Sequence, residues 1–248
     1  MSEHVPAVAH PAATVVLLRD GAGGCEVLLV RRNARLAFHG GAWVFPGGRV
    51  DPEDYTGTAG PTDIVAAARN AAVREAREEA GVTVRRDDLV PLSRWITPAG
   101  LPKRFDAWFF AARAASDTVQ VDGSEIHAHR WIRPAAALAA HGEGQLDLPP
   151  PTFVTLTGLA GYCTAAEALA AVACRRFETF VPRLHAVADG ACTLYAEDAG
   201  YETGRIDEPG PRHRLWMLES GWRYERTGVP RPAASAAHGG SNVVSGDR

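Results

Sequence analysis

No uninterrupted apolar stretch in this sequence approaches the roughly 18 residues that a membrane-spanning helix requires. The first residues, MSEHVPAVAHPAAT, also lack the basic segment and the continuous apolar segment of a secretory signal peptide. We therefore expect a soluble, cytoplasmic protein with no membrane partner.

The sequence has no excess of basic residues and little cysteine. It holds 26 Lys and Arg against 29 Asp and Glu, a formal net charge of −3. Nucleic-acid binding needs a basic surface that displaces counterions from phosphate, so we expect no nucleic-acid partner. The cysteines show neither C-x-x-C spacing nor the density of a disulfide-rich secreted domain, so we expect them to be reduced, mostly buried and free of zinc. They are Cys25, Cys163, Cys174 and Cys192.

Several catalytic signatures are missing as well. No nucleophile elbow, Walker sequence or dinucleotide-binding glycine pattern is present, which argues against serine-hydrolase, P-loop and Rossmann chemistry. The length of 248 residues suits one large domain, or one domain with an appended piece.

The elements that the sequence does predict alternate between strands and helices. Apolar, β-branched or alternating runs predict strands, and four-residue periodicity or a leading proline predicts helices. The expected strands are 13–18, 26–31, 42–45, 89–96, 105–112 and 126–132, with a last strand or hairpin at 215–224. The expected helices lie between Thr62 and Gly81 and at 135–140, 153–161 and 165–177. This mixture predicts an α/β (α+β) sandwich with a mixed sheet.

Composition divides the chain into four parts. Residues 1–11 are expected to be flexible, and residues 12–147 to form the main domain. The Pro-rich segment 148–152 marks a join, after which 148–228 is expected to be a mainly helical annex packed on that domain. Residues 229–248, rich in Pro, Ala, Ser and Gly, are expected to be a disordered tail.

The longest predicted helix carries the most informative pattern. Thr62 is the expected N-cap, Gly81 suits a left-handed C-terminal residue, and alanines recur every four positions between them. Near its end, REAREEAGV places Glu75, Glu78 and Glu79 at neighbouring positions of one face.

Three carboxylates held this close repel one another unless a cation neutralises them. Oxygen-only ligands select a hard divalent ion such as Mg²⁺ or Mn²⁺. The alternative is a solvated acidic face on which Arg74 pairs with Glu78. Phe45-Pro46-Gly47-Gly48, upstream of the helix, favours the functional interpretation, because paired glycines let a backbone approach a ligand closely.

Together, the glycine pair, the loop and REAREEAGV resemble the Nudix hydrolase signature, G-x5-E-x7-R-E-U-x-E-E-x-G-U, in which U is aliphatic. The second half matches if Ala76 occupies the first U position. Six residues after Gly48, Asp54 stands where the pattern has Glu, and the spacing to Arg74 is then 12 residues too long, which indicates a loop insertion. Taking Gly60 as the first glycine restores the spacing but puts Ala66 at the Glu position. We prefer the insertion.

The resemblance implies a Nudix-type α/β/α sandwich and a cation-dependent hydrolase that cleaves the P–O–P link of a small-molecule diphosphate. It implies that Glu75, Glu78 and Glu79 bind Mg²⁺ or Mn²⁺, and that Glu78 or Glu79 also serves as the base. Arg74 would orient these carboxylates, and Glu125 is a candidate for an additional ligand or base. Nudix relatives are often dimers, so a homodimer is possible.

The segment LLVRRNARLAFHGGAWVFPGG, residues 28–48, resembles part of the motif of the coenzyme A diphosphatase branch, L-L-T-x-R-[SA]-x3-R-x3-G-x3-F-P-G-G. Val30, Asn33 and Ala37 depart from it. Coenzyme A or an acyl derivative is therefore the expected substrate, with ADP-ribose or NADH as the alternative. A Nudix-like binding module without catalysis is the alternative from another class. The expected substrate-binding residues are Arg32, Arg35, Gly47, Gly48 and Arg104.

Overall fold

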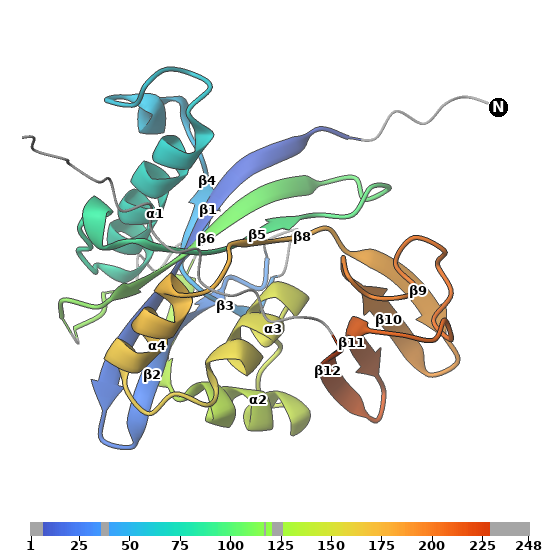
Figure 1. Cartoon of the computed structure of the whole chain (residues 1–248). Coiled ribbons are helices and arrows are strands. Elements are labelled where there is room, and N and C mark those ends of the chain that lie inside the picture. The colour runs from blue at the N-terminus through green and yellow to red at the C-terminus, as the bar shows by residue number, and fades with distance from the viewer. Residues whose placement is uncertain (1–6, 36–39, 117, 121–125, 229–248) are drawn as a thin grey trace, which may run out of the picture.

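The computed structural model describes residues 7–35, 40–116, 118–120 and 126–228 (Figure 1). Within these residues the chain forms an eight-stranded mixed sheet, a four-stranded antiparallel sheet and four α-helices. The strands are β1 (Ala9–Gly21), β2 (Gly24–Arg32), β3 (Trp43–Val44), β4 (Gly47–Arg49), β5 (Val90–Ile96), β6 (Arg104–Arg113), β7 (Ile126–Ile132), β8 (Glu178–Phe180), β9 (Arg183–Val187), β10 (Gly190–Leu194), β11 (Arg212–Leu218) and β12 (Gly221–Thr227). The helices are α1 (Ile64–Ala80), α2 (Pro134–Gly142), α3 (Pro150–Leu159) and α4 (Ala165–Ala173), with 3-10 turns η1 (Pro52–Tyr55) and η2 (Arg86–Asp88).

The large sheet has the order β3-β2-β1-β6-β5-β8, with β4 added on β1 and β7 on β2. It is mixed because β1 pairs in parallel with β6, and β5 with β8, while its other pairs are antiparallel. One edge of β1 changes partner along its length. The β2 partner faces residues 18–21, and β4 faces residues 12–14. The glycine pair of β4 therefore lies where the sheet splits.

Helices cover both faces of this sheet, as an α/β/α sandwich requires (Figure 1). The α1 face packs small residues against β1 and β6, and Ala68, Ala72, Ala76 and Ala80 are fully buried there. Side chains this small let the helix backbone lie close to the strands. On the other face, α2, α3 and α4 bury a larger apolar cluster that includes Leu29, Phe109 and Leu156.

The C-terminal part differs from the mainly helical annex that composition predicts. Its helices α3 and α4 belong to the second helical layer of the sandwich, and β8 extends the large sheet beside β5. Beyond β8, β9–β12 form the separate antiparallel sheet at the right of Figure 1. The short and weakly alternating sequences of β9 and β10 do not predict strands, whereas the Ala-rich segment of α4 predicts a helix. Of this sheet, the sequence predicts only the hairpin β11–β12, as the strand or hairpin at 215–224.

The N-terminal segment also differs from the prediction that residues 1–11 are flexible. Residues 9–11 are not flexible, because they belong to β1 and pair with residues 104–106 of β6. The expected tail, 229–248, lies outside the described residues. The described part of the chain holds no helix long and apolar enough to cross a membrane. All four cysteines are free, as expected, but only Cys25 and Cys192 are buried.

Candidate functional site

The helix α1 is positioned by caps at both ends. Asp63, rather than Thr62, is its N-cap, and the Asp63 carboxylate accepts a hydrogen bond from the Ala66 amide at 3.2 Å. At the other end Gly81 adopts φ 67°, a left-handed conformation that glycine tolerates best. The signature glycine therefore ends the helix directly after the carboxylates.

Two of the three predicted carboxylates point into the protein. Glu75 and Glu79 are 9% and 6% exposed, and both face the β4 side of α1. The Glu79 carboxylate accepts a hydrogen bond from the Gly47 amide at 2.8 Å. Glu78 differs, because half of its side chain is exposed at the edge of this face.

Neighbouring atoms lie so close to both glycines of β4 that neither position has room for a side chain. A Cβ at Gly47 would collide with the Ala13 carbonyl of β1. A Cβ at Gly48 would collide with the carboxylate of Glu75. The Phe-Pro-Gly-Gly segment thus lets one helical carboxylate lie against the β4 backbone.

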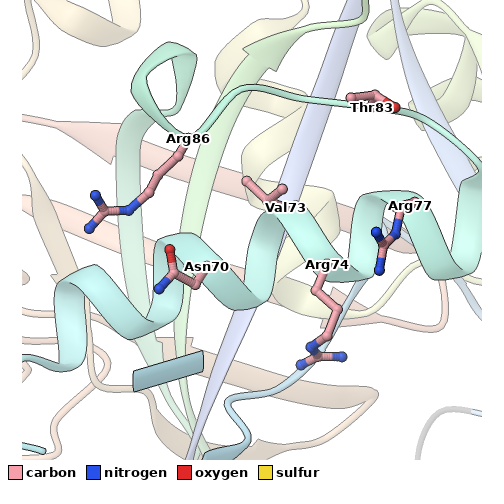
Figure 2. Close-up of a pocket in the computed structure, with 6 residues that line it drawn as sticks. All are labelled: Asn70, Val73, Arg74, Arg77, Thr83 and Arg86. Carbon is pink, nitrogen blue, oxygen red and sulfur yellow. The ribbon is translucent and has the colours of Figure 1, made fainter. Parts of the chain in front are cut away.

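Arg74 links the acidic groups of the site. One of its Nη atoms lies 2.8 Å from Glu75 and 3.0 Å from Glu78. The other lies 3.0 Å from Asp54 and donates to the Arg49 carbonyl of β4 at 2.9 Å. In Figure 2 its side chain extends away from α1. Arg74 therefore contacts three carboxylates at once, those of Asp54, Glu75 and Glu78.

The position of Asp54 is consistent with the interpretation in which a loop is inserted before α1. It is 5% exposed in η1 and binds the Arg74 guanidinium with both carboxylate oxygens. Ala66, the alternative at this position, is a buried alanine in the first turn of α1. The loop between η1 and α1 thus leaves the Asp54–Arg74 contact intact.

The electrostatics of the site suit a bound cation. Burial raises the pKa of Glu75 above its usual value, an effect that Arg74 offsets only in part and that the Glu78 charge adds to. Burial alone would lower the pKa of Arg74, but the hydrogen bond to Asp54 and the charges of Glu75 and Glu78 raise it. Glu75, Glu78 and Glu79 offer carboxylate oxygens, which are the donors that Mg²⁺ or Mn²⁺ prefers, and two of the three are buried. The residues present therefore fit such an ion.

The expected substrate-binding arginines are not all near these carboxylates. Arg32 ends β2, and its buried Nε has no hydrogen-bond partner among the residues that the structure describes. Arg35 is exposed in the following loop. Arg104 is engaged elsewhere, because its guanidinium donates to the carbonyls of Thr97 and Ala7. Arg104 pairs with Ala9 of β1, whereas Gly48 pairs with Ala13, so about 13 Å of strand separates them. Glu125 lies outside the described residues.

Sequence reasoning missed a second acidic group, which lies between β8 and the C-terminal sheet. Potential metal-ligating atoms of Glu178, Glu197 and His213 all lie within 4.8 Å of one another. Arg226 already lies 2.8 Å from Glu178 and 3.5 Å from Glu197, so the carboxylates are ion-paired. These residues are far apart in sequence, which explains why no spacing pattern indicated them.

The chain matches a family model described as the NUDIX domain over residues 8–150, more than half of its length. It is 27% identical over 170 residues to the Caenorhabditis elegans protein named "Putative nudix hydrolase 7". That alignment covers 54% of this chain and 55% of the relative, so the chain spans about half the length of the curated relative.

The fold is shared with a solved Nudix structure. A NUDIX hydrolase from Alicyclobacillus acidocaldarius superposes with a TM-score of 0.58 at 26% identity, over 66% of this chain and 96% of that one. The NUDIX domain of Shewanella oneidensis NrtR complexed with ADP ribose gives a TM-score of 0.46 at 16% identity, over 61% and 86% of the two chains.

Proposed function

Because this chain belongs to the Nudix family, we propose that it is a cation-dependent diphosphatase that hydrolyses the P–O–P link of a small molecule, with coenzyme A or an acyl-coenzyme A as substrate. The observation that carries the proposal is the placement of Glu75 and Glu79 of α1 directly against the glycine pair of β4. Burying two carboxylates side by side costs free energy, and a bound cation would offset that cost.

In this proposal Glu75, Glu78 and Glu79 hold Mg²⁺ or Mn²⁺. A bound divalent ion neutralises phosphate charge and lowers the pKa of water, which makes water a nucleophile near neutral pH. Glu79 is fixed by the Gly47 amide, and Glu75 by Arg74. These contacts keep both carboxylates in place.

Glu78 is the preferred general base. Its half-exposed carboxylate can reach a water molecule from the solvent side of the helix, while the more enclosed Glu79 is held by the β4 backbone. A base must lie within hydrogen-bond reach of the proton that it removes. Arg74 pairs with Glu78 and would fix its orientation.

The coenzyme A assignment rests on the segment from Leu28 to Gly48. The structure places Leu28 and Leu29 in the core of β2, with Arg31 and Arg32 at the end of that strand. Guanidinium groups match phosphate oxygens well, and coenzyme A carries a diphosphate and a 3′-phosphate. Arg32 and Arg35 are the proposed substrate contacts, whereas the engaged guanidinium of Arg104 makes it a weaker candidate.

Product analysis tests the proposal. Purified protein is incubated with coenzyme A, acetyl-coenzyme A, ADP-ribose or NADH, in the presence of Mg²⁺ or Mn²⁺ and with an EDTA control. We expect cation-dependent release of 3′,5′-ADP from the coenzyme A substrates. Release of AMP from ADP-ribose or NADH alone would keep the catalytic helix but overturn the coenzyme A assignment.

A further inference from the structure

A cleft of about 400 Å³ opens on the outer side of α1, between the helix and the segment that follows it. We call it the outer cleft. Figure 2 shows the residues that line it, with the helix on one side and the segment carrying Thr83 and Arg86 on the other. The lining residues are Asn70, Val73, Arg74, Arg77, Thr83 and Arg86.

The outer cleft opens on a different face of α1 from Glu75 and Glu79, although Arg74, which lines it, also contacts Glu75 and Glu78. A helix turns by about 100° per residue, so Arg77 projects about 160° away from Glu79 around the axis of α1. Glu79 is buried against β4, whereas Arg77 is exposed. A ligand in the outer cleft would therefore not reach the face of α1 that carries Glu75 and Glu79.

The charge that lines this cleft is positive and largely uncompensated. None of its lining residues is acidic. Arg74 is committed to Asp54, Glu75 and Glu78. Arg77 and Arg86, by contrast, have no ion-pair or side-chain hydrogen-bond partner in the part of the chain that the structure describes. Of the two acids that follow Arg86, Asp88 lies 4.0 Å from Arg85, and neither Asp87 nor Asp88 lines the cleft.

The two walls of the cleft are tied together. Arg69 of α1 donates one Nη hydrogen bond to the Leu89 carbonyl at 2.6 Å and a longer one to the Arg86 carbonyl at 3.4 Å. Burial, and then the like charge of Arg86, lower the pKa of Arg69, while Asp87 opposes this. The backbone that carries Arg86 is thus fixed relative to the helix that carries Arg77, which lowers the cost of ordering the cleft around a ligand.

We propose that the outer cleft binds the phosphate group of a small molecule through Arg77 and Arg86. A planar guanidinium presents paired donors that match phosphate oxygens, and two uncompensated guanidiniums favour a doubly charged anion. Thr83 supplies an exposed hydroxyl donor from the second wall, and Val73 a partly buried apolar surface between them. The proposal does not depend on hydrolysis, because none of the three catalytic glutamates takes part.

The test uses inorganic phosphate and the full chain at constant ionic strength. The arginine side-chain N–H signals of ¹⁵N-labelled protein are followed by NMR, with EDTA present so that no cation attracts phosphate to Glu75, Glu78 and Glu79. We expect saturable shifts at Arg77 and Arg86. Arg77→Ala and Arg86→Ala should each weaken the apparent phosphate affinity about tenfold or more, with unchanged thermal unfolding.

Arg85→Ala is the matched control, because Arg85 is adjacent to Arg86, is 80% exposed and does not line the cleft. It should change the phosphate affinity less than about twofold. Shifts that never saturate, or an equal loss in Arg85→Ala, would show diffuse charge attraction and overturn the proposal. Either result would leave the diphosphatase proposal untouched, since no turnover is measured.

Discussion

The Arg74 guanidinium lies 3.0 Å from the Asp54 carboxylate, although 20 positions separate the two residues. This contact joins η1, which precedes the loop before α1, to the helix that carries the proposed cation-binding glutamates. Asp54 also accepts a hydrogen bond from the Asp51 amide at 2.9 Å, which fixes the turn itself. The insertion is therefore anchored at the site.

Asp54→Asn should destabilise the protein by about 1–3 kcal/mol, because it removes the charged acceptor of a partly buried hydrogen-bond pair. Urea unfolding measures this. Glu53→Gln, at the exposed neighbouring position, is the control and should stay within about 0.5 kcal/mol of wild type. Equal effects of the two substitutions would show that the Asp54–Arg74 contact contributes nothing.

The two glycines of β4 should respond differently to alanine. Gly47→Ala forces a Cβ onto the β1 backbone and should cost stability, about 1–3 kcal/mol by overpacking. At Gly48 the three atoms nearest to the added Cβ all belong to the flexible carboxylate of Glu75, so Gly48→Ala should displace that group and lower turnover at least about tenfold while the fold tolerates it.

Gly161→Ala is the control for both glycine variants, because no atom lies within 4 Å of its added Cβ. Thermal unfolding and turnover are measured on all three proteins. If Gly48→Ala kept full activity, Glu75 could not hold the position assigned to it.

The affinity for the cation should fall as the pH is lowered. This fall should begin at a higher pH than it would in a site built from glutamates with ordinary pKa values. Burial raises the pKa of Glu75, so as pH falls this group takes up a proton before a normal glutamate would, and the proton competes with the cation. Mn²⁺ titrations over a pH series measure the effect. Glu75→Gln, which cannot titrate, should bind Mn²⁺ more weakly and with a flatter pH dependence. An equally steep dependence in that variant would contradict the assignment.

His213 should make folding stability pH-dependent. Burial lowers its pKa from the usual 6.5, although Glu178 opposes this, so the folded protein holds the imidazole neutral. The unfolded chain takes up a proton as pH falls through about 6.5, so the stability that His213 contributes is present above that pH and is lost below it. Urea unfolding at about pH 7.5 and pH 5.5 tests the sign. His213→Gln should show a smaller difference between the two values, and an unchanged difference would refute the prediction.

The central helix and the sandwich class could be predicted because their signals are local. A cap, a four-residue alanine repeat and a C-terminal glycine define α1 within about one residue. The strand at 126–132 matches β7 because period-two alternation is equally local. The same spacing places Glu75, Glu78 and Glu79 close together on that helix, and their catalytic role stays a prediction.

The rest depends on contacts between distant residues. The sequence around β8 does not show that this strand pairs with β5. That parallel pairing is fixed by tertiary packing, such as the stacking of Trp95 on Phe180 with ring centroids 4.0 Å apart. The weak pattern of β9 and β10 likewise concealed a four-stranded sheet. Arg104 looked available for substrate, but the carbonyls that engage it come from residues 7 and 97.

The central claim is that the α1 carboxylates hold the cation that drives diphosphate hydrolysis. The most direct test compares Glu78→Gln and Glu79→Gln with Glu143→Gln, an exposed glutamate at the end of α2. Mn²⁺ affinity and turnover are measured on the same samples. We expect both helix variants to bind Mn²⁺ more weakly and to lose turnover by about 100-fold or more, while Glu143→Gln behaves as wild type. Normal turnover by both helix variants with cation present would contradict the account.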